Sequence, residues 1–339
     1  MNIIYIHTSL RPSGPSSQLQ ILLRHNSQNN NHYLFLINKK YNLIFDNVYH
    51  IKDIFELVKI IRKASRDELI IHSSGLIPDF VLSLLILFIP KKFKSFSTIR
   101  NIPWEDYKFK WKIFGPLISK LHILFLRQIN VICCSKTVYS AFQKRKYIFQ
   151  SLNFIDNCYT LKNIDQSNQI KAGKFKILSV SPIINRKRVL ESVKLFKKLK
   201  MDFEFDIYGE GDQKSDLVQI INNDKRFRYM GFIKNDQINF SHYDSLISFS
   251  ASEGLPNSVI ESLYCGSYAI LSSISSHKYL AKFSRKVLII DYLSEEKILK
   301  AISYILRNRD SKKDIESFRD YFSKSRMLNQ YHYRYNLKD

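Results

Sequence analysis

The stretch SLISFSASEGLPNSVIESLYCGSYAILSS, at residues 245–273, decides the fold of the second half of the chain. Its two short apolar runs, at 245–250 and 268–273, are typical of buried strands. Residues 257–264 between them have a helical pattern, and Pro256 suits a first helical turn because the N–H that it lacks would be unbonded there. A strand, a helix and a second strand in this order predict a parallel sheet.

The same alternation extends through the rest of the chain. In the first half we expect strands at 2–7, 32–37, 68–72, 94–99 and 130–134, and helices near 16–27, 52–64, 76–89, 110–128 and 136–146. In the second half we expect strands at 176–181, 203–208, 227–231, 245–250, 268–273 and 286–290, and helices near 188–200, 213–222, 257–264 and 293–307. The pattern predicts an α/β protein with parallel sheets.

A polar stretch, Thr160 to Lys174, breaks this rhythm and is the expected linker. The sequence therefore predicts domains at 1–158 and 175–315, a linker at 159–174, and a C-terminal helix or tail at 316–339 that packs back on the body. Two Rossmann-like domains would face each other across a cleft, and open α/β sheets bind ligands beyond the carboxyl ends of their strands.

Length and composition exclude several classes of protein. The chain has 339 residues, enough for two domains, and 45% apolar against 24% charged residues excludes wholesale disorder. Four cysteines without a CxxC pair predict neither a disulfide framework nor a zinc site, which favours a reduced, intracellular protein. The first residues have no signal-peptide pattern. The apolar run from Phe80 to Pro90 is about half of a membrane span, so we expect a core helix.

The charge balance indicates an anionic partner. There are 53 Lys and Arg against 30 Asp and Glu, a formal net charge of +23. Basic clusters beside apolar residues, KKFK at 91–94 and KRK at 144–146, favour an anionic membrane surface. Nucleic acid ranks behind it because no zinc finger, RNP signature or basic zipper is present. The alternative, that the charged surface only provides solubility, remains open.

Candidate chemistry gathers after the strand at 245–250. Glu253 and Gly254 fall at its carboxyl end, and the backbone N–H groups of residues 257–259 would open the next helix. A helix N-terminus binds anions and suits a diphosphate. Glu253 on the loop and Glu261 one turn into the helix could accept hydrogen bonds from sugar hydroxyls. Two glutamates eight residues apart are commonplace by themselves, and the full string after a buried strand is what makes the pattern specific.

The string SASEGLPNSVIESLYCGSYAILSS, at 250–273, resembles the Glu-seven-residues-Glu signature of family-4 retaining glycosyltransferases of the GT-B fold. Upstream, KILSVSPIINRKRV (176–189) is similar to the strand and phosphate-binding turn of that family. YGEGD (208–212) is similar to its Gly-rich loop, and MGFIKND (230–236) to its nucleotide-base loop. The resemblance covers most of residues 175–275 and implies the GT-B fold.

The resemblance also implies residue roles. Glu253 would contact the donor hexose, Glu261 the ribose, and Lys187 the diphosphate, so that Glu253 and Lys187 are the catalytic candidates. The other implied donor-binding residues are Gly14, Arg186, Gly209, Glu210, Gly211, Phe232, Ile233, Gly254, Leu255, Pro256, Asn257, Ser258 and Val259. Pro182 stands where the family usually has an arginine, so Arg186 or Arg188 is expected to replace it. The alternative for Arg186 and Arg188 is a solvated helix start.

The first half resembles the family more loosely. RPSGPSSQL (11–19), IHSSGLIPD (71–79) and STIRNIPWEDY (97–107) are similar to its first turn and acceptor-side segments. Ser74 and Arg100 stand where the family often has histidines. The acceptor-cleft candidates are His72, Arg100, Glu105 and Asp106. A purely structural role remains the alternative for each of them.

The resemblance implies a cytoplasmic, membrane-peripheral retaining glycosyltransferase. It would move a hexose or N-acetylhexosamine from a UDP-linked sugar to a lipid-linked glycan of O-antigen or capsule. No Asp-x-Asp motif follows a strand, so we expect neither a metal nor another cofactor. Two alternatives stay open: a degenerate GT-B scaffold that binds nucleotide sugar or glycan without transfer, and a sugar-nucleotide epimerase.

Overall fold

The computed structural model divides the chain into two compact units, which are described separately below. Unit 1 comprises Met1–Asn157 with Lys324–Asp339, and unit 2 comprises Cys158–Ser323. The structure describes residues 2–9, 13–26, 32–36, 48–50, 54–64, 69–89, 93–160, 173–233, 237–291, 294–309 and 315–336. Most of the expected linker, the basic residues Lys91 and Lys92, and part of the expected base loop (234–236) lie outside these ranges.

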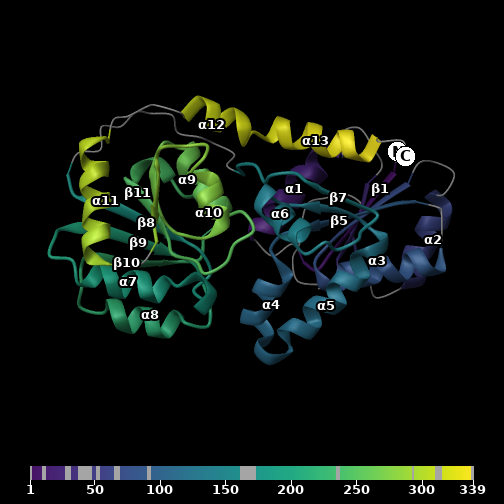
Figure 1. The fold of residues 1–339 in the computed structure, drawn as a ribbon, viewed down its shortest axis with the longest axis horizontal. Helices are drawn as coiled ribbons and strands as arrows, with labels where there is room; N and C mark the ends of the chain where they lie inside the picture. The colour runs from purple at the N-terminus through teal and green to yellow at the C-terminus, as the bar shows by residue number, and fades with distance from the viewer. Residues whose placement is uncertain are drawn as a thin grey trace. The chain divides into compact units, whose positions relative to one another are not determined.

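Unit 1 is built on a seven-stranded parallel sheet in the order β3-β2-β1-β4-β5-β6-β7 (Figure 1). The strands are β1 (Asn2–His7), β2 (His32–Leu36), β3 (Val48–His50), β4 (Leu69–Ser74), β5 (Lys94–Ile99), β6 (Asn130–Cys133) and β7 (Ser151–Phe154). The helices are α1 (Gly14–Asn26), α2 (Ile54–Ala64), α3 (Leu76–Phe88), α4 (Pro103–Trp111), α5 (Gly115–Phe125), α6 (Lys136–Lys144) and α13 (Lys324–Asn336), with 3-10 turns η1 (Lys112–Phe114) and η2 (Leu126–Gln128).

The core of unit 1 lies around β1 and β4, whose residues are all buried. Helices cover both faces of a parallel sheet, which is why such strands read as continuous apolar runs. The C-terminal helix α13 joins this unit through two tyrosines: the Tyr331 hydroxyl lies 3.1 Å from Thr98 Oγ1, and the Tyr335 hydroxyl lies 2.5 Å from His72 Nδ1. The last residues of the chain therefore help to build the N-terminal unit.

Unit 2 is built on a six-stranded parallel sheet in the order β10-β9-β8-β11-β12-β13. The strands are β8 (Phe175–Val180), β9 (Phe203–Tyr208), β10 (Phe227–Gly231), β11 (Ser245–Ser248), β12 (Tyr268–Ser272) and β13 (Val287–Ile290). The helices are α7 (Val189–Lys197), α8 (Lys214–Ile221), α9 (Asn257–Tyr264), α10 (Ser275–Leu280), α11 (Glu295–Arg307) and α12 (Ile315–Tyr321), with 3-10 turns η3 (Asn185–Lys187) and η5 (Phe240–His242).

The strand order of unit 2 reverses between β8 and β11. The chain runs outward from β8 to β10 and then returns to the other side of β8, so that α7 and α8 lie on one side of the sheet and α9 on the other (Figure 1). In open α/β sheets this switch point is where ligands bind, beyond the carboxyl ends of the strands. The loops after β8 and β11 are therefore where a site is expected.

The structure confirms the predicted α/β alternation and corrects it locally. Residues 97–107, expected as a strand followed by a loop, include the start of α4, and the helix expected at 110–128 is broken at η1, where Lys112 adopts a φ of 45°. The short strand β3 and the six-residue helix α10 were not expected from the sequence, and the strand that the resemblance implies at 153–159 lies earlier, as β7. No helix among the described residues is both long and apolar enough to cross a membrane. All four cysteines are free thiols.

Candidate active site

The loops that follow β8 and β11 in unit 2 bind each other directly. The Ala251 N–H donates to the Arg186 carbonyl at 2.9 Å, and the Arg186 guanidinium donates to the Ser252 carbonyl at 2.6 Å. The Lys187 ammonium donates to the Glu253 carboxylate, and the Arg186 guanidinium lies 3.6 Å from the same carboxylate. Two cations from one loop and one carboxylate from the other thus meet at the switch point of the sheet.

Glu253 is held as a carboxylate. Burial alone would raise its pKa, but Lys187 and Arg186 outweigh that effect and lower the pKa of Glu253 to about 2. The Ser250 hydroxyl adds a hydrogen bond to the same carboxylate at 2.8 Å. A group of this kind accepts hydrogen bonds at neutral pH and is too weak a base to serve as a general acid or base there.

Arg186, rather than Arg188, supplies the second positive charge beside Glu253. Arg188 is exposed, adopts a left-handed conformation (φ 51°) and precedes the first residue of α7. Pro182, where the resemblance leads one to expect an arginine, is exposed in the same loop. The structure therefore favours the first of the two replacements considered from the sequence.

The helix α9 begins at Asn257, directly after this loop. Pro256 caps it in an extended conformation and makes no side-chain cap hydrogen bond. The first bond within the helix runs from Ile260 N–H to the Pro256 carbonyl at 3.2 Å, so the helix itself has no acceptors for the amides of residues 257–259. Gly254, Leu255, Pro256 and Asn257 are buried, while Ser258 is half-buried. The helix therefore begins a few residues after Glu253, the carboxylate that binds the two cations, and its N-terminal dipole adds positive potential there.

Glu261, in the middle of α9, is fully buried. The Thr160 hydroxyl donates a hydrogen bond to its carboxylate, so a residue at the start of the expected linker binds α9. Tyr159 also packs on this helix, with its ring centroid 3.9 Å from that of Tyr264. Sequence spacing alone could not predict the Thr160–Glu261 pair, because its members are about a hundred residues apart in the chain.

The Gly-rich loop after β9 supports the cationic loop. A Cβ atom on Gly209 would lie 1.9 Å from the Ser181 carbonyl oxygen, and one on Gly211 would lie 2.1 Å from the Ile183 carbonyl oxygen. The Ile183 N–H donates to the Glu210 carbonyl at 3.0 Å. The two glycines therefore let residues 209–211 pack against the loop that carries Arg186 and Lys187.

The remaining predicted donor residues of unit 2 lie near the ends of β9 and β10. Glu210 points to the surface, where its carboxylate accepts hydrogen bonds from Lys214 at 3.0 Å and Tyr229 at 2.8 Å. These bonds lower the pKa of Glu210. Phe232 is exposed and Ile233 is half-buried, just beyond β10. Their predicted contacts with the donor stay predictions.

In unit 1, the predicted residues sit at the carboxyl edge of the sheet. Gly14 opens α1, next to Ser13 and Ser16, which bond each other's backbone N–H groups. His72 has a partner on each ring nitrogen, the Tyr335 hydroxyl and the Thr98 hydroxyl. Burial and then Arg100 lower the pKa of His72 to about 3, so the ring is neutral at pH 7.

Arg100, just after β5, donates to Asn157 Oδ1 at 3.2 Å, while its buried Nε has no hydrogen-bond partner. No ion pair to Arg100 occurs within the part of the chain that the structure describes. Glu105 is exposed on the first turn of α4, and Asp106 accepts a hydrogen bond from Asn101 at 3.1 Å. The roles of these residues toward an acceptor stay predictions.

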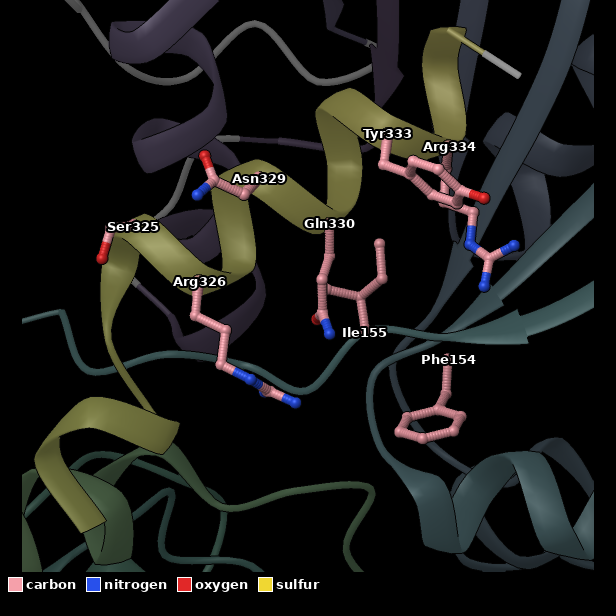
Figure 2. Close-up of a pocket in the computed structure, with 8 residues that line it drawn as sticks. All are labelled: Phe154, Ile155, Ser325, Arg326, Asn329, Gln330, Tyr333 and Arg334. Atoms are coloured by element: carbon pink, nitrogen blue, oxygen red, sulfur yellow. The ribbon is translucent and has the colours of Figure 1, made fainter. Parts of the chain in front are cut away.

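A cavity of about 540 Å³ lies elsewhere in unit 1, between the end of β7 and α13 (Figure 2). Arg326, Gln330 and Arg334 reach into it from α13, and Phe154 and Ile155 line it from the strand side. None of the residues predicted from the sequence as site residues lines this cavity.

Sequence reasoning missed one buried group beside Glu253. His277, on α10, donates from Nδ1 to the Ser272 carbonyl at 2.9 Å, and its Nε2 has no hydrogen-bond partner. Burial lowers the pKa of His277 to about 4, although Glu253 raises it. The only signal in the sequence was the polar run SSH after the apolar strand at 268–273. No cluster of three or more metal-ligating side chains is found in the described residues.

Comparison with known proteins shows what the chain is similar to. Residues 161–319 match the family model "Glycosyl transferases group 1". The O-antigen biosynthesis glycosyltransferase WclY of Escherichia coli is 24% identical over a 360-residue alignment that covers 99% of this chain and 98% of the relative.

Two solved structures share the whole fold. Anabaena Alr3699/HepE in complex with UDP-glucose superposes with a TM-score of 0.78 at 14% identity, over 98% of this chain and 99% of that one. Sucrose-phosphate synthase of Thermosynechococcus elongatus superposes with a TM-score of 0.77 at 16% identity, over 99% and 98%. The fold is GT-B, and the match of residues 161–319 to the group 1 model identifies the chain as a glycosyltransferase.

Proposed function

We propose that this glycosyltransferase transfers a hexose or N-acetylhexosamine, with retention of configuration, from a UDP-linked sugar to a lipid-linked glycan acceptor. The product would be a surface polysaccharide such as O-antigen or capsule. The observation that carries the proposal is the junction of Arg186, Lys187 and Glu253 beside the N-terminus of α9. The O-antigen role in the name of WclY and the UDP-glucose bound in HepE support the polysaccharide and the donor.

The chemical need in glycosyl transfer is to stabilise the charge that develops on the departing nucleoside diphosphate. Lys187, Arg186 and the first amides of α9 provide fixed positive charge and N–H dipoles at one edge of the sheet. Preorganised donors of this kind contribute about 3 kcal/mol each when they are aimed at the developing charge. We propose that these protein groups, without a metal, meet that charge.

The two glutamates would bind hydroxyl groups of the donor. Because the pKa of Glu253 is about 2, it is a hydrogen-bond acceptor for the sugar ring and not a proton donor to the leaving group. Glu261 would accept from the ribose hydroxyls in place of the Thr160 hydroxyl, which now donates to it. In the acceptor half, the unpartnered Nε of Arg100 is the group best suited to a polar substituent of the glycan.

The test uses the purified full chain with UDP-, GDP- and ADP-sugars. A ligand that binds only the folded protein raises its stability, by about 2.7 kcal/mol at 100 times Kd. We expect a UDP-sugar to raise the melting temperature, and both Lys187→Gln and Glu253→Gln to abolish the shift. Lys300→Gln is the matched control, because it breaks the exposed pair with Glu296 in the same unit.

Donor turnover gives the second readout. The wild-type protein should consume the UDP-sugar in the presence of a lipid-linked glycan, with or without EDTA, and NMR of the product should show the anomeric configuration of the donor. A Glu261→Ala variant that turns over donor as fast as wild type would overturn the donor site, and an inverted product would overturn retention.

A further inference from the structure

A hairpin of unit 1, formed by α4, η1 and α5, carries an apolar outer face. Ile113 and Phe114, in η1, are 90% and 68% exposed. Leu117, Leu121 and Leu124 follow on α5 at positions i, i+4 and i+7, which share one side of a helix, and all three are exposed. We call these five side chains the hairpin apolar face. In Figure 1, α4 and α5 extend away from the sheet of unit 1.

The inner side of the hairpin is fixed by buried polar contacts. The Tyr107 hydroxyl lies 2.7 Å from His122 Nδ1, and His122 Nε2 lies 2.6 Å from the Asp79 carboxylate of α3. Gly115 lets α5 approach α4, since a Cβ there would lie 2.5 Å from the Tyr107 carbonyl oxygen. With these bonds satisfied on the inside, the apolar face cannot turn inward.

The charges of residues 107–128, which carry the hairpin apolar face, all have one sign, and the acids Glu105 and Asp106 lie at the start of α4. Residues 107–128 contain Lys108, Lys110, Lys112, Lys120 and Arg127, and no Asp or Glu. In the run KFKWKIF, at 108–114, lysines alternate with aromatic or apolar residues, and the Lys110 ammonium lies 4.3 Å above the Trp111 ring. Lysines flanking exposed apolar and tryptophan side chains are typical of segments that bind the headgroup region of anionic bilayers.

The apolar area continues onto α3. The Phe80 ring of α3 packs on Phe125 of α5 with centroids 5.0 Å apart, and Phe80 keeps 40% of its surface exposed. Leu87 and Phe88, near the end of α3, are exposed as well. The sequence predicts a core helix here, but one side of α3 is in the core and the other faces solvent.

We propose that the hairpin apolar face and its lysines dock the protein on a bilayer that contains anionic lipid. Charge complementarity selects this occupant: two copies of residues 107–128 would bring ten cations together without an acid among them. This surface is distinct from the basic clusters at 91–94 and 144–146. Docking through it does not depend on the donor sugar or on the proposed reaction.

Vesicle binding tests the proposal. The full chain is sedimented with vesicles of phosphatidylcholine alone or with about one third phosphatidylglycerol. We expect binding only to the anionic vesicles, reduced by about 10- to 100-fold in Lys108→Gln/Lys110→Gln/Lys112→Gln. The double variant Ile113→Ser/Phe114→Ser should also bind the anionic vesicles more weakly, and its remaining binding should fall more steeply with salt than that of the wild type, because salt screens the charges but not the apolar insertion.

Matched controls come from exposed positions of unit 2. Lys194→Gln/Lys198→Gln/Lys200→Gln removes the same charge, and Leu306→Ser removes exposed apolar surface; both should bind as wild type does. Equal losses in the two triple variants, or wild-type binding by the hairpin variants, would overturn the proposal. So would a change from oligomer to monomer in the hairpin variants without an effect on vesicle binding.

The same variants separate this inference from the proposed function. Melting with and without UDP-sugar, measured in the absence of vesicles, should give the wild-type shift in the hairpin variants. Failure of the donor shift in the wild-type protein would count against the proposed function alone, and failure of vesicle binding would count against the docking surface alone.

Discussion

Single residues of the site are already engaged with one another. Lys187 binds Glu253, and Thr160 binds Glu261, so each carboxylate proposed to bind the donor has a partner from the protein. A sugar hydroxyl must compete with such a partner, and the strength of that competition sets part of the donor affinity. Two predictions concern single residues of this site.

Thr160→Val should tighten binding of the UDP-sugar, by about three- to tenfold, because it removes the hydroxyl that competes for Glu261. Calorimetric titration of donor into the purified variant measures the change. Thr160→Ser, which keeps a hydroxyl, should bind as wild type does. Weaker binding by the valine variant would instead mean that Thr160 orients Glu261 for the ribose.

Arg186→Gln should lower kcat/KM for the donor by about 100-fold, whereas Arg188→Gln should leave it near the wild-type value. The reason is placement: the Arg186 guanidinium is 3.6 Å from Glu253, while Arg188 is exposed at the start of α7. Steady-state kinetics with a saturating acceptor separates the two variants. Equal effects of the two substitutions would show that the site needs positive charge in this loop rather than a cation at the position of Arg186.

Among the elements, the loops of unit 2 depend on close backbone approaches at Gly209 and Gly211. Gly211→Ala should destabilise the protein by about 2–4 kcal/mol, because the new methyl group would meet the Ile183 carbonyl oxygen. Urea unfolding measures the change. Gly231→Asn is the control, since the space around Gly231 is open and asparagine tolerates its φ of 68°.

The elements also show what the sequence could predict. The strands β8 and β11 and the helix α9 were predictable because apolar runs bounded by Gly, Pro and Ser carry a strong periodic signal. The break at η1 was not, since residues 110–128 read as one continuous apolar helix, and the turn depends on the packing of Gly115 against Tyr107. Within the site, the string after β11 located Glu253, whereas Thr160 and His277 reach it through tertiary contacts that leave no local pattern.

For the whole molecule, three buried neutral histidines make stability depend on pH. Burial is the first cause that lowers the pKa of His7 to about 4, of His72 to about 3 and of His277 to about 4. Below pH 6.5 the unfolded chain binds protons that the folded protein does not. Each histidine should therefore reduce the free energy of unfolding by up to about 1.4 kcal/mol per pH unit as the pH falls toward these values.

Urea unfolding between about pH 7 and pH 4.5 checks this expectation. The slope of the free energy of unfolding against pH should be smaller in His7→Gln, because this substitution removes one proton-binding site. Glu253 affects stability at lower pH. Its contribution to the free energy of unfolding is complete above its unfolded pKa of about 4.5 and declines only as the pH falls toward 2. A free energy of unfolding that stays constant from pH 7 to pH 5 would contradict the prediction.

The last sixteen residues, 324–339, are grouped with the first 157, and the contacts of Tyr331 and Tyr335 with Thr98 and His72 join them. A gene fragment that stops after residue 157 would therefore encode an incomplete domain, whose His72 ring would lose its tyrosine partner. An exchange of the N-terminal unit between such enzymes has to include the C-terminal residues 324–339 as well, so the crossover must be made at two places in the gene rather than one.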